Sequence, residues 1–312
     1  MSGESHQALA RLAGRDTASL VALGVAGTAT SDKDKVLYRL RTEMICQDPE
    51  AEYNWLIRHL QSSDLTINFR AYKFFAKKPK GVGYVNQFEG ANQWGGDTYV
   101  AVRDGAEQAM FNYNGANARP ASVPAAVANR AQMLGNLDNL EFEPAVRPKY
   151  AGLNYAGLKY GASANWGKSF MVLKEYVKHN ATYVHTDSFD VGGNARQLAA
   201  LAGQVATFAR MDRLLVNMVP NMFKALVRAA HGVSYGADKY APGLGKTCYI
   251  EAQVHGEILF ERDIAKIVIS MDELTNAKAK AEKAGLKPVS PDKLRDTYTK
   301  FSKKYGIPVI LN

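Results

Sequence analysis

The chain of 312 residues is predicted to adopt an α+β fold with a helical N-terminal lobe and a basic helical C-terminal end. Segments with strand alternation are separated by helical segments of unequal length, without the regular period of a doubly wound parallel sheet. Hydrophobic residues make up 46% of the chain and charged residues 22%, which is ordinary for a globular protein with an ample core. The net charge of +9 is concentrated near the C-terminus.

Four segments are expected along the chain. The first is rich in Ala, Ser, Thr and Gly with weak patterning, which is typical of a mobile leader. A small helical lobe follows, then a core that carries the strands, and finally a basic helical segment. Their expected limits are residues 1–30, 31–63, 64–272 and 273–312.

Local signals place the elements within these segments. Ser31 and Asp32 are suited to cap a helix over residues 33–46, and Asp48 before Pro49 predicts the start of a second helix. Alternation or apolar runs predict the strands of the core. Strands are expected at 65–70, 150–155, 168–173, 181–186, around Glu251 and at 264–269, and helices at 125–137, 194–219 and 222–230.

The strand around Glu251 has one polar and one apolar face. Side chains alternate along a strand, so Tyr249, Glu251, Gln253 and His255 share one side, and Ile250, Ala252 and Val254 the other. A carboxylate and an amide two residues apart can hold a sugar diol where an enzyme stabilises a positively charged ribose. The same alternation also fits a half-exposed strand with solvated polar residues.

The C-terminal segment carries most of the excess charge. From residue 274 onward, nine Lys or Arg stand against three acids, a net +6 of the total +9. Such a segment can dock nucleic acid or an acidic partner, but it lacks the interleaved aromatic residues typical of single-strand binding. A solvated pair of helices is the favoured interpretation.

Several classes of protein are disfavoured. No apolar run reaches the ~18 residues of a membrane span, so no membrane association is expected. The two cysteines, Cys46 and Cys248, give no disulfide framework and favour a reducing compartment. The six His are scattered, so no metal site is expected. Residues 243–247 resemble the end of a P-loop, but Tyr240 stands where its first glycine belongs.

Six segments occur together in a recognisable order. They are residues 65–70, 83–89, 147–154, 166–173, 182–188 and 249–256, the last reading YIEAQVHG. In this order and approximate spacing, from about residue 64 to 270, they resemble bacterial mono-ADP-ribosyltransferase effectors of the CteC-like family, which modify a threonine of ubiquitin. The resemblance implies an ADP-ribosyltransferase-like split β-sheet core, with two small sheets around a cleft that holds NAD as substrate.

The resemblance also implies a biological setting. We expect transfer of ADP-ribose from NAD to a host protein, with a threonine of ubiquitin as the acceptor and a block of host ubiquitination as the result. The leader would serve as a secretion signal, with a secretion chaperone as its partner. A specialised secretion system would deliver the chain into the host cytosol, and nucleic acid is not expected as a partner.

The resemblance assigns the catalytic roles to three residues. Loss of nicotinamide creates an oxocarbenium-like ribose, so the protein must position the sugar and stabilise positive charge. Glu251 is assigned to the ribose 2′-hydroxyl and the developing cation, and Gln253 to orienting the ribose or the acceptor. Glu89 completes the catalytic set. A threonine hydroxyl needs an activating base, for which Glu251, Glu89 and His185 all remain open.

Six residues are assigned to holding NAD. Arg70 would pair with the pyrophosphate through its planar fork, and Tyr150 would stack on the nicotinamide. The remaining assignments are Asn86 and Gln87 near a ribose, Asn154 and Ser169 near the nicotinamide. Arg70 equally fits a local ion pair, and Tyr150 a core aromatic.

Three residues that end one strand are further candidates. They are His185, Asp187 and Ser188, and the last two also fit a simple turn cap. Two departures from related transferases bear on the acceptor. Residues 70–73 replace the family's turn after the first strand, and Glu251-Ala252-Gln253 stands where arginine-directed enzymes carry a pair of acidic or amide residues ending in Glu. The pattern disfavours an arginine acceptor.

Two functions of other classes compete with the transferase. One is a non-catalytic module that binds a host protein, and the other is an RNA-directed nuclease that uses the basic end.

Overall fold

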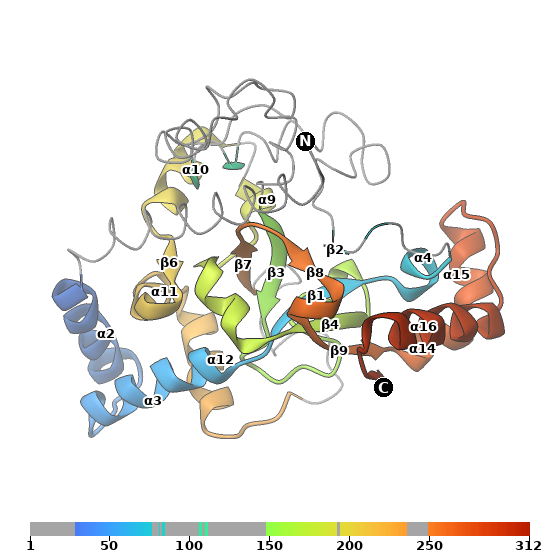
Figure 1. Cartoon of the computed structure of the whole chain (residues 1–312). Helices are drawn as coiled ribbons and strands as arrows, with labels where there is room; N and C mark the ends of the chain where they lie inside the picture. Colours follow the sequence, from blue (N-terminus) through green and yellow to red (C-terminus); the bar gives the residue numbers. More distant parts are fainter. Residues whose placement is uncertain are drawn as a thin grey trace.

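A computed structural model describes residues 29–76, 81, 83–84, 106–107, 110–111, 148–191, 194–235 and 249–312. Its strands form an eight-stranded sheet in the order β10-β9-β4-β1-β3-β7-β5-β6 and a two-stranded sheet of β2 and β8 (Figure 1). The strands are β1 (Leu65–Phe69), β2 (Gly83–Tyr84), β3 (Lys149–Leu153), β4 (Ser169–Leu173), β5 (Ala181–Val184), β6 (Ala206–Thr207), β7 (Ile250–Val254), β8 (Ile258–Leu259), β9 (Ile264–Ile269) and β10 (Val309–Leu311).

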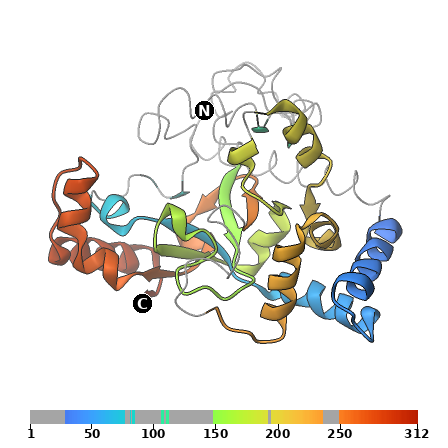
Figure 2. The same cartoon turned by 180° about the vertical axis from the view of Figure 1, so that it is seen from behind.

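Helices lie around this sheet. They include α2 (Ala29–Glu43), α3 (Pro49–Ser62), α4 (Ala71–Phe74), α9 (Ser188–Val191), α10 (Ala195–Ala202), α11 (Asp212–Asn217), α12 (Pro220–Ala230), α13 (Phe260–Asp263), α14 (Met271–Thr275), α15 (Ala277–Lys283) and α16 (Pro291–Tyr305). The first two and the last three lie at opposite ends of the molecule, as Figure 1 and the reverse view in Figure 2 both show. The predicted α+β class is confirmed.

Strand β1 joins two halves of the large sheet. It pairs with β4 over Thr66–Phe69 but with β3 only through Leu65 and Thr66, so β1 and β3 diverge beyond that point. Asn68 fills the opening. Its Nδ2 donates to the Tyr160 carbonyl at 2.6 Å and the Gly167 carbonyl at 2.8 Å. The sheet is antiparallel except where β10 joins β9.

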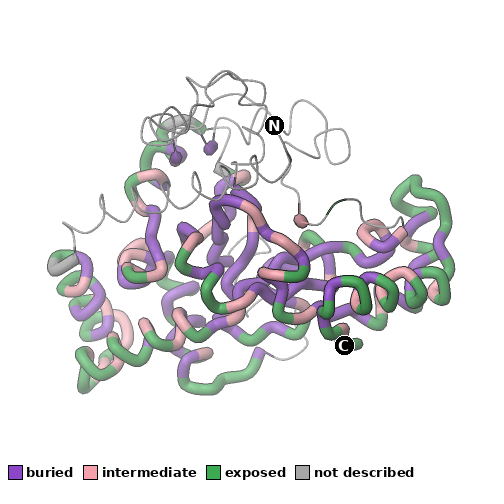
Figure 3. Tube along the Cα trace, viewed as in Figure 1, coloured by how far each residue is buried: buried purple, intermediate pink, exposed green. Residues whose placement is uncertain are grey.

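The alternation predicted for the strand around Glu251 is confirmed. Ile250, Ala252 and Val254 lie in the main hydrophobic core, and the polar residues of β7 point to the other face. Figure 3 shows that the strands are buried along nearly their whole length, while the outer helices carry the exposed surface.

The predicted lobe forms with small differences. Asp48 caps α3 by accepting from the Ala51 amide at 3.0 Å, as its place before Pro49 predicts. The first helix begins at Ala29, before the expected cap, and ends at Glu43. The helix expected over residues 194–219 is broken by β6 between α10 and α11.

The basic C-terminal segment is packed into the same core. Leu294, Phe301 and Tyr305 of α16 are buried in the main cluster, and the Phe301 ring contacts the Phe260 ring with centroids 4.9 Å apart. Strand β10 extends the edge of the large sheet. The segment therefore contributes to folding as well as to charge. In the described part of the chain, no helix is long and apolar enough to cross a membrane.

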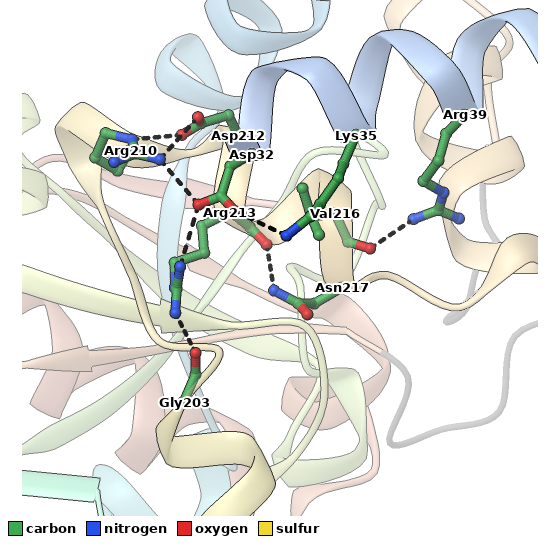
Figure 4. A network of polar contacts seen from close by, with 9 residues as sticks. All are labelled: Asp32, Lys35, Arg39, Gly203, Arg210, Asp212, Arg213, Val216 and Asn217. Carbon is green, nitrogen blue, oxygen red and sulfur yellow. Dashed lines mark hydrogen bonds and ion pairs between the residues drawn. The ribbon is translucent and has the colours of Figure 1, made fainter. Parts of the chain in front are cut away.

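A buried ion cluster attaches α2 to the sheet-bound helices (Figure 4). Asp32 is 3% exposed, and its Oδ2 accepts from Arg210 at 2.9 Å and Arg213 at 3.1 Å. Arg210 also pairs with Asp212 at 2.9 Å. Because two partly buried guanidinium groups converge on the buried Asp32 carboxylate, removing its charge takes away a shared partner of both.

Asp32→Asn is expected to lower the free energy of unfolding by about 3 kcal/mol, because breaking one member of a buried ion cluster leaves the others uncompensated. Urea denaturation monitored by circular dichroism measures the change. Asp34→Asn is the matched control, since Asp34 lies on the same helix and is exposed. Equal stability of the two variants would contradict the structural role of the cluster.

Candidate functional site

The polar face of β7 is buried. Glu251 and Gln253 are both 0% exposed, so the interpretation of a half-exposed strand with solvated polar residues is wrong. In register, Glu251 lies between Gly152 of β3 and Val184 of β5, and Gln253 lies between Tyr150 and Thr182. Buried polar groups are costly unless they are hydrogen-bonded, so their partners define the site.

Two donors converge on one oxygen of Glu251. The Ser188 hydroxyl donates to Oε1 at 2.5 Å, and the Gln253 Nε2 donates to the same atom at 2.7 Å. The Ser188 backbone amide lies 3.3 Å from Oε2. Ser188, the first residue of α9, thus brings a helix end to the catalytic candidate. These bonds orient the carboxylate.

The series of hydrogen bonds continues from Gln253 of β7 to Thr182 of β5 and from there to His255, which directly follows β7. The Thr182 hydroxyl donates to Gln253 Oε1 at 3.0 Å, so the amide must turn its NH₂ toward Glu251. The His255 Nε2 lies 2.9 Å from the same hydroxyl oxygen. Because the Thr182 proton is already given to Gln253, His255 must donate from a protonated Nε2.

His255 is the last residue in this series of hydrogen bonds, and its ring is neutral. Burial, and secondarily the charge of Lys149, lower the pKa of His255 to about 3. Its Nδ1 is buried without a hydrogen-bond partner in the described part of the chain. The Phe111 ring meets the imidazole edge-on, with centroids 4.9 Å apart. The hydrogen bonds require a proton on Nε2, and the lowered pKa leaves the ring neutral, with no proton on Nδ1.

A second buried carboxylate faces the site through Tyr150. The Tyr150 hydroxyl donates to Glu107 Oε1 at 2.6 Å, and Glu107 is 0% exposed. Since Tyr150 lies opposite Gln253, this pair flanks the catalytic candidates. Sequence reasoning missed Glu107, because no strand or motif signal marks its position.

Arg70 lies at the far end of the same face. Phe69 is in the hydrophobic core, so the exposed Arg70 projects to the side of the sheet that carries Thr66. Thr66 pairs with Gly152, which pairs with Glu251. No hydrogen bond or ion pair joins the Arg70 guanidinium to another described residue, so the local ion pair considered for it is not formed there.

Other candidates are not brought to Glu251. Ser169 shares its face with Met171 of the core and donates to Glu273 at 2.9 Å. Asn154 closes a turn, accepting from the Leu158 amide at 2.9 Å and donating to its carbonyl. Asn154 therefore serves local structure, whereas Ser169 joins β4 to α14.

The three candidates that follow β5, namely His185, Asp187 and Ser188, have different partners. Burial, and secondarily the positive charge of Arg39, lower the pKa of His185, and its Nδ1 is buried without a hydrogen-bond partner among the described residues. Asp187 accepts from the Phe189 amide at 2.9 Å and from the Tyr249 hydroxyl at 3.3 Å, which is the turn cap considered for it. Ser188 alone reaches Glu251. Asn86, Gln87 and Glu89 lie outside the described residues.

A comparison with protein families bears on these residues. The model of the family described as "Protein of unknown function (DUF3626)" matches residues 84–281, more than half of the chain. The chain belongs to the DUF3626 family. Among curated proteins, none matches it.

The DUF3626 region holds the whole buried site, from Glu107 to His255, and also Glu273. Arg70 and the helices α2 and α3 lie before it, and the whole of α16 lies after it. Among the described residues of this DUF3626 chain, no group of three His, Cys, Asp or Glu is placed to hold a metal ion.

The depressed pKa of His255 predicts acid sensitivity. Below pH 6.5 the unfolded chain binds a proton at this ring, whereas the folded chain does not until about pH 3. Stability contributed by the neutral ring is therefore lost as the pH falls through this window. Between pH 7 and pH 5 the wild type should lose about 2 kcal/mol more unfolding free energy than His255→Gln.

Urea denaturation at the two pH values measures this difference. His179→Gln serves as the control, because it removes an exposed His and leaves His255 in place. Parallel losses in wild type and His255→Gln would show that the ring does not titrate as described.

Proposed function

We propose that this chain transfers ADP-ribose from NAD to a protein, with a threonine of host ubiquitin as the acceptor. The buried, oriented carboxylate of Glu251 is the observation that carries the proposal. A charge fixed in a water-poor site stabilises a developing cation better than a mobile charge in water, because it needs no reorganisation. The resemblance of residues 249–256 to CteC-like transferases supplies the reaction.

The arrangement of Glu251 and Arg70 supports a dinucleotide substrate. Glu251 is in register with Thr66 across β3, two strand spacings or roughly 10 Å away, and Arg70 lies four residues, roughly 13 Å, beyond Thr66 on the same face. In the proposed complex, Glu251 meets the nicotinamide-side ribose and Arg70 meets the pyrophosphate. The large sheet is continuous, with β1 paired to β3, so the split core rests on the resemblance alone.

In the proposed reaction, the bond between ribose C1′ and the nicotinamide nitrogen breaks, and nicotinamide leaves as a neutral molecule. The acceptor hydroxyl oxygen then bonds to C1′ and gives its proton to a base. Of the three residues considered as that base, we favour Glu251, because its carboxylate is held by Ser188 and Gln253, whereas the His185 Nδ1 has no hydrogen-bond partner among the described residues and Glu89 lies outside them. Gln253 orients the ribose or the acceptor while holding Glu251.

The wider setting is proposed on the resemblance alone. The chain would act in the host cytosol after delivery by a specialised secretion system, with a secretion chaperone at its N-terminus, and it would block ubiquitination.

Glu251→Gln is expected to lower the rate of transfer by about 10²- to 10³-fold, because it removes the charge that stabilises the cation. Intact-mass spectrometry of ubiquitin incubated with NAD and the protein measures the reaction. Wild type should add one ADP-ribose. Glu261→Gln, an exposed acid on α13, should retain full activity.

The same assay separates the other functions. A binding module would capture its partner with or without NAD, and equally after Glu251→Gln. A nuclease would degrade RNA in the absence of NAD. Unmodified ubiquitin together with a modified host protein would move the acceptor elsewhere, whereas no modified protein at all would reject the transferase.

A further inference from the structure

Another buried carboxylate, that of Glu273, lies next to the backbone that follows Arg70. Glu273 of α14 is 3% exposed, and three donors converge on it. Its Oε2 accepts from the Ala71 amide at 2.7 Å and the Ser169 hydroxyl at 2.9 Å, and its Oε1 accepts from the Lys168 amide at 2.9 Å. Since Ala71 directly follows Arg70, this carboxylate holds one side of the Arg70 backbone.

The other side of Arg70 is held by close packing. Phe69 pairs with Ser169 in the sheet, and Gly167 approaches the same peptide. A Cβ added at Gly167 would lie 2.0 Å from the Phe69 carbonyl oxygen and 2.7 Å from the Arg70 nitrogen. The backbone of Arg70 is therefore constrained from both directions, although its side chain is exposed.

Two neighbouring cations, Arg70 and Lys73, lie at the start of α4. The Lys73 amide donates to the Arg70 carbonyl at 2.9 Å, so the two residues are one helical turn apart. Burial, and secondarily the positive charge of Arg70, lower the pKa of Lys73. Two like charges at close range repel each other, and an anion bound between them would relieve that repulsion. Among the described residues, neither side chain has a carboxylate partner.

We propose that Glu273 is a positioning residue that holds Arg70 ready for the anionic part of a dinucleotide, with Lys73 as a second cation beside it. This inference rests on the proposed function. A carboxylate suits the role because it is purely an acceptor and can serve all three donors. An amide in its place would turn NH₂ toward one of these donors and leave that donor unpaired.

Calorimetric titration of the full chain with NAD tests the inference through a double-mutant cycle. Arg70→Ala should weaken binding by about 10- to 100-fold, the value of one charge-assisted hydrogen bond. Glu273→Gln should weaken it by about five- to tenfold. Because Glu273 acts through Arg70, the double variant should bind no more weakly than Arg70→Ala alone, within about twofold.

Matched variants separate positioning from folding. Asp272→Asn, on the same helix but in surface pairs with Lys168 and Lys280, should leave NAD affinity unchanged. If Glu273→Gln does not fold, Ser169→Ala replaces it in the cycle, because it removes one donor from the same carboxylate. It should weaken binding by about two- to fivefold, and only when Arg70 is present.

The outcomes are distinct. NAD affinity that stays at the wild-type value in the Glu273 or Ser169 variant overturns the positioning role and leaves the proposed transferase intact. So does an equal loss with and without Arg70. A wild-type chain that binds no NAD overturns both the positioning role and the proposed function.

Discussion

The directional hydrogen bonds that end on Glu251 are the constraint on which the site depends. Each side chain in this series of hydrogen bonds is buried, so loss of one hydrogen bond leaves a polar group unpaired at a cost of about 1–3 kcal/mol. The links join β5, β7 and α9, so forming the site requires these elements to be in place together. The Glu251 carboxylate only accepts, so it fixes the NH₂ of Gln253 toward itself, the Thr182 hydroxyl toward Gln253 and the Nε2 proton of His255 toward Thr182. Orientation of the Glu251 carboxylate is thereby made part of the stability of the fold.

Two buried carboxylates hold residues at the two ends of the proposed site, from opposite faces of the sheet, since Glu273 bonds Ser169 on the core face. Glu251 is itself aimed at the proposed reacting sugar, whereas Glu273 acts on the backbone beside Arg70. Strand β1 connects the two ends, since it begins in register with β3 and finishes at Arg70. The C-terminal helices, whose charge first draws attention, supply Glu273 and several core aromatic residues. Their contribution to the site is therefore structural as well as electrostatic.

Local periodicity predicted the positions of the longer strands β1, β3, β4, β5, β7 and β9 and the faces of β7, because alternation depends only on backbone geometry. It did not predict the short strands β2, β6, β8 and β10. It could not predict burial of the polar face, which depends on segments distant in sequence. The Ser188–Glu251 bond spans 63 residues, and no pattern in either segment indicates that they meet. Ser169 shows a different limit. Residues 169–173 are buried on both faces, so the pattern alone does not reveal that Ser169 lies away from Glu251. Glu107 carries no signal of any kind in the sequence.

A crystal structure of the chain with a non-hydrolysable NAD analogue tests the central claim most directly. In this complex the Glu251 carboxylate is expected to retain its bonds from Ser188 and Gln253 and to lie within hydrogen-bond distance of the 2′-hydroxyl on the nicotinamide-side ribose. An analogue bound with that sugar away from Glu251, or a carboxylate turned toward other groups, would contradict it.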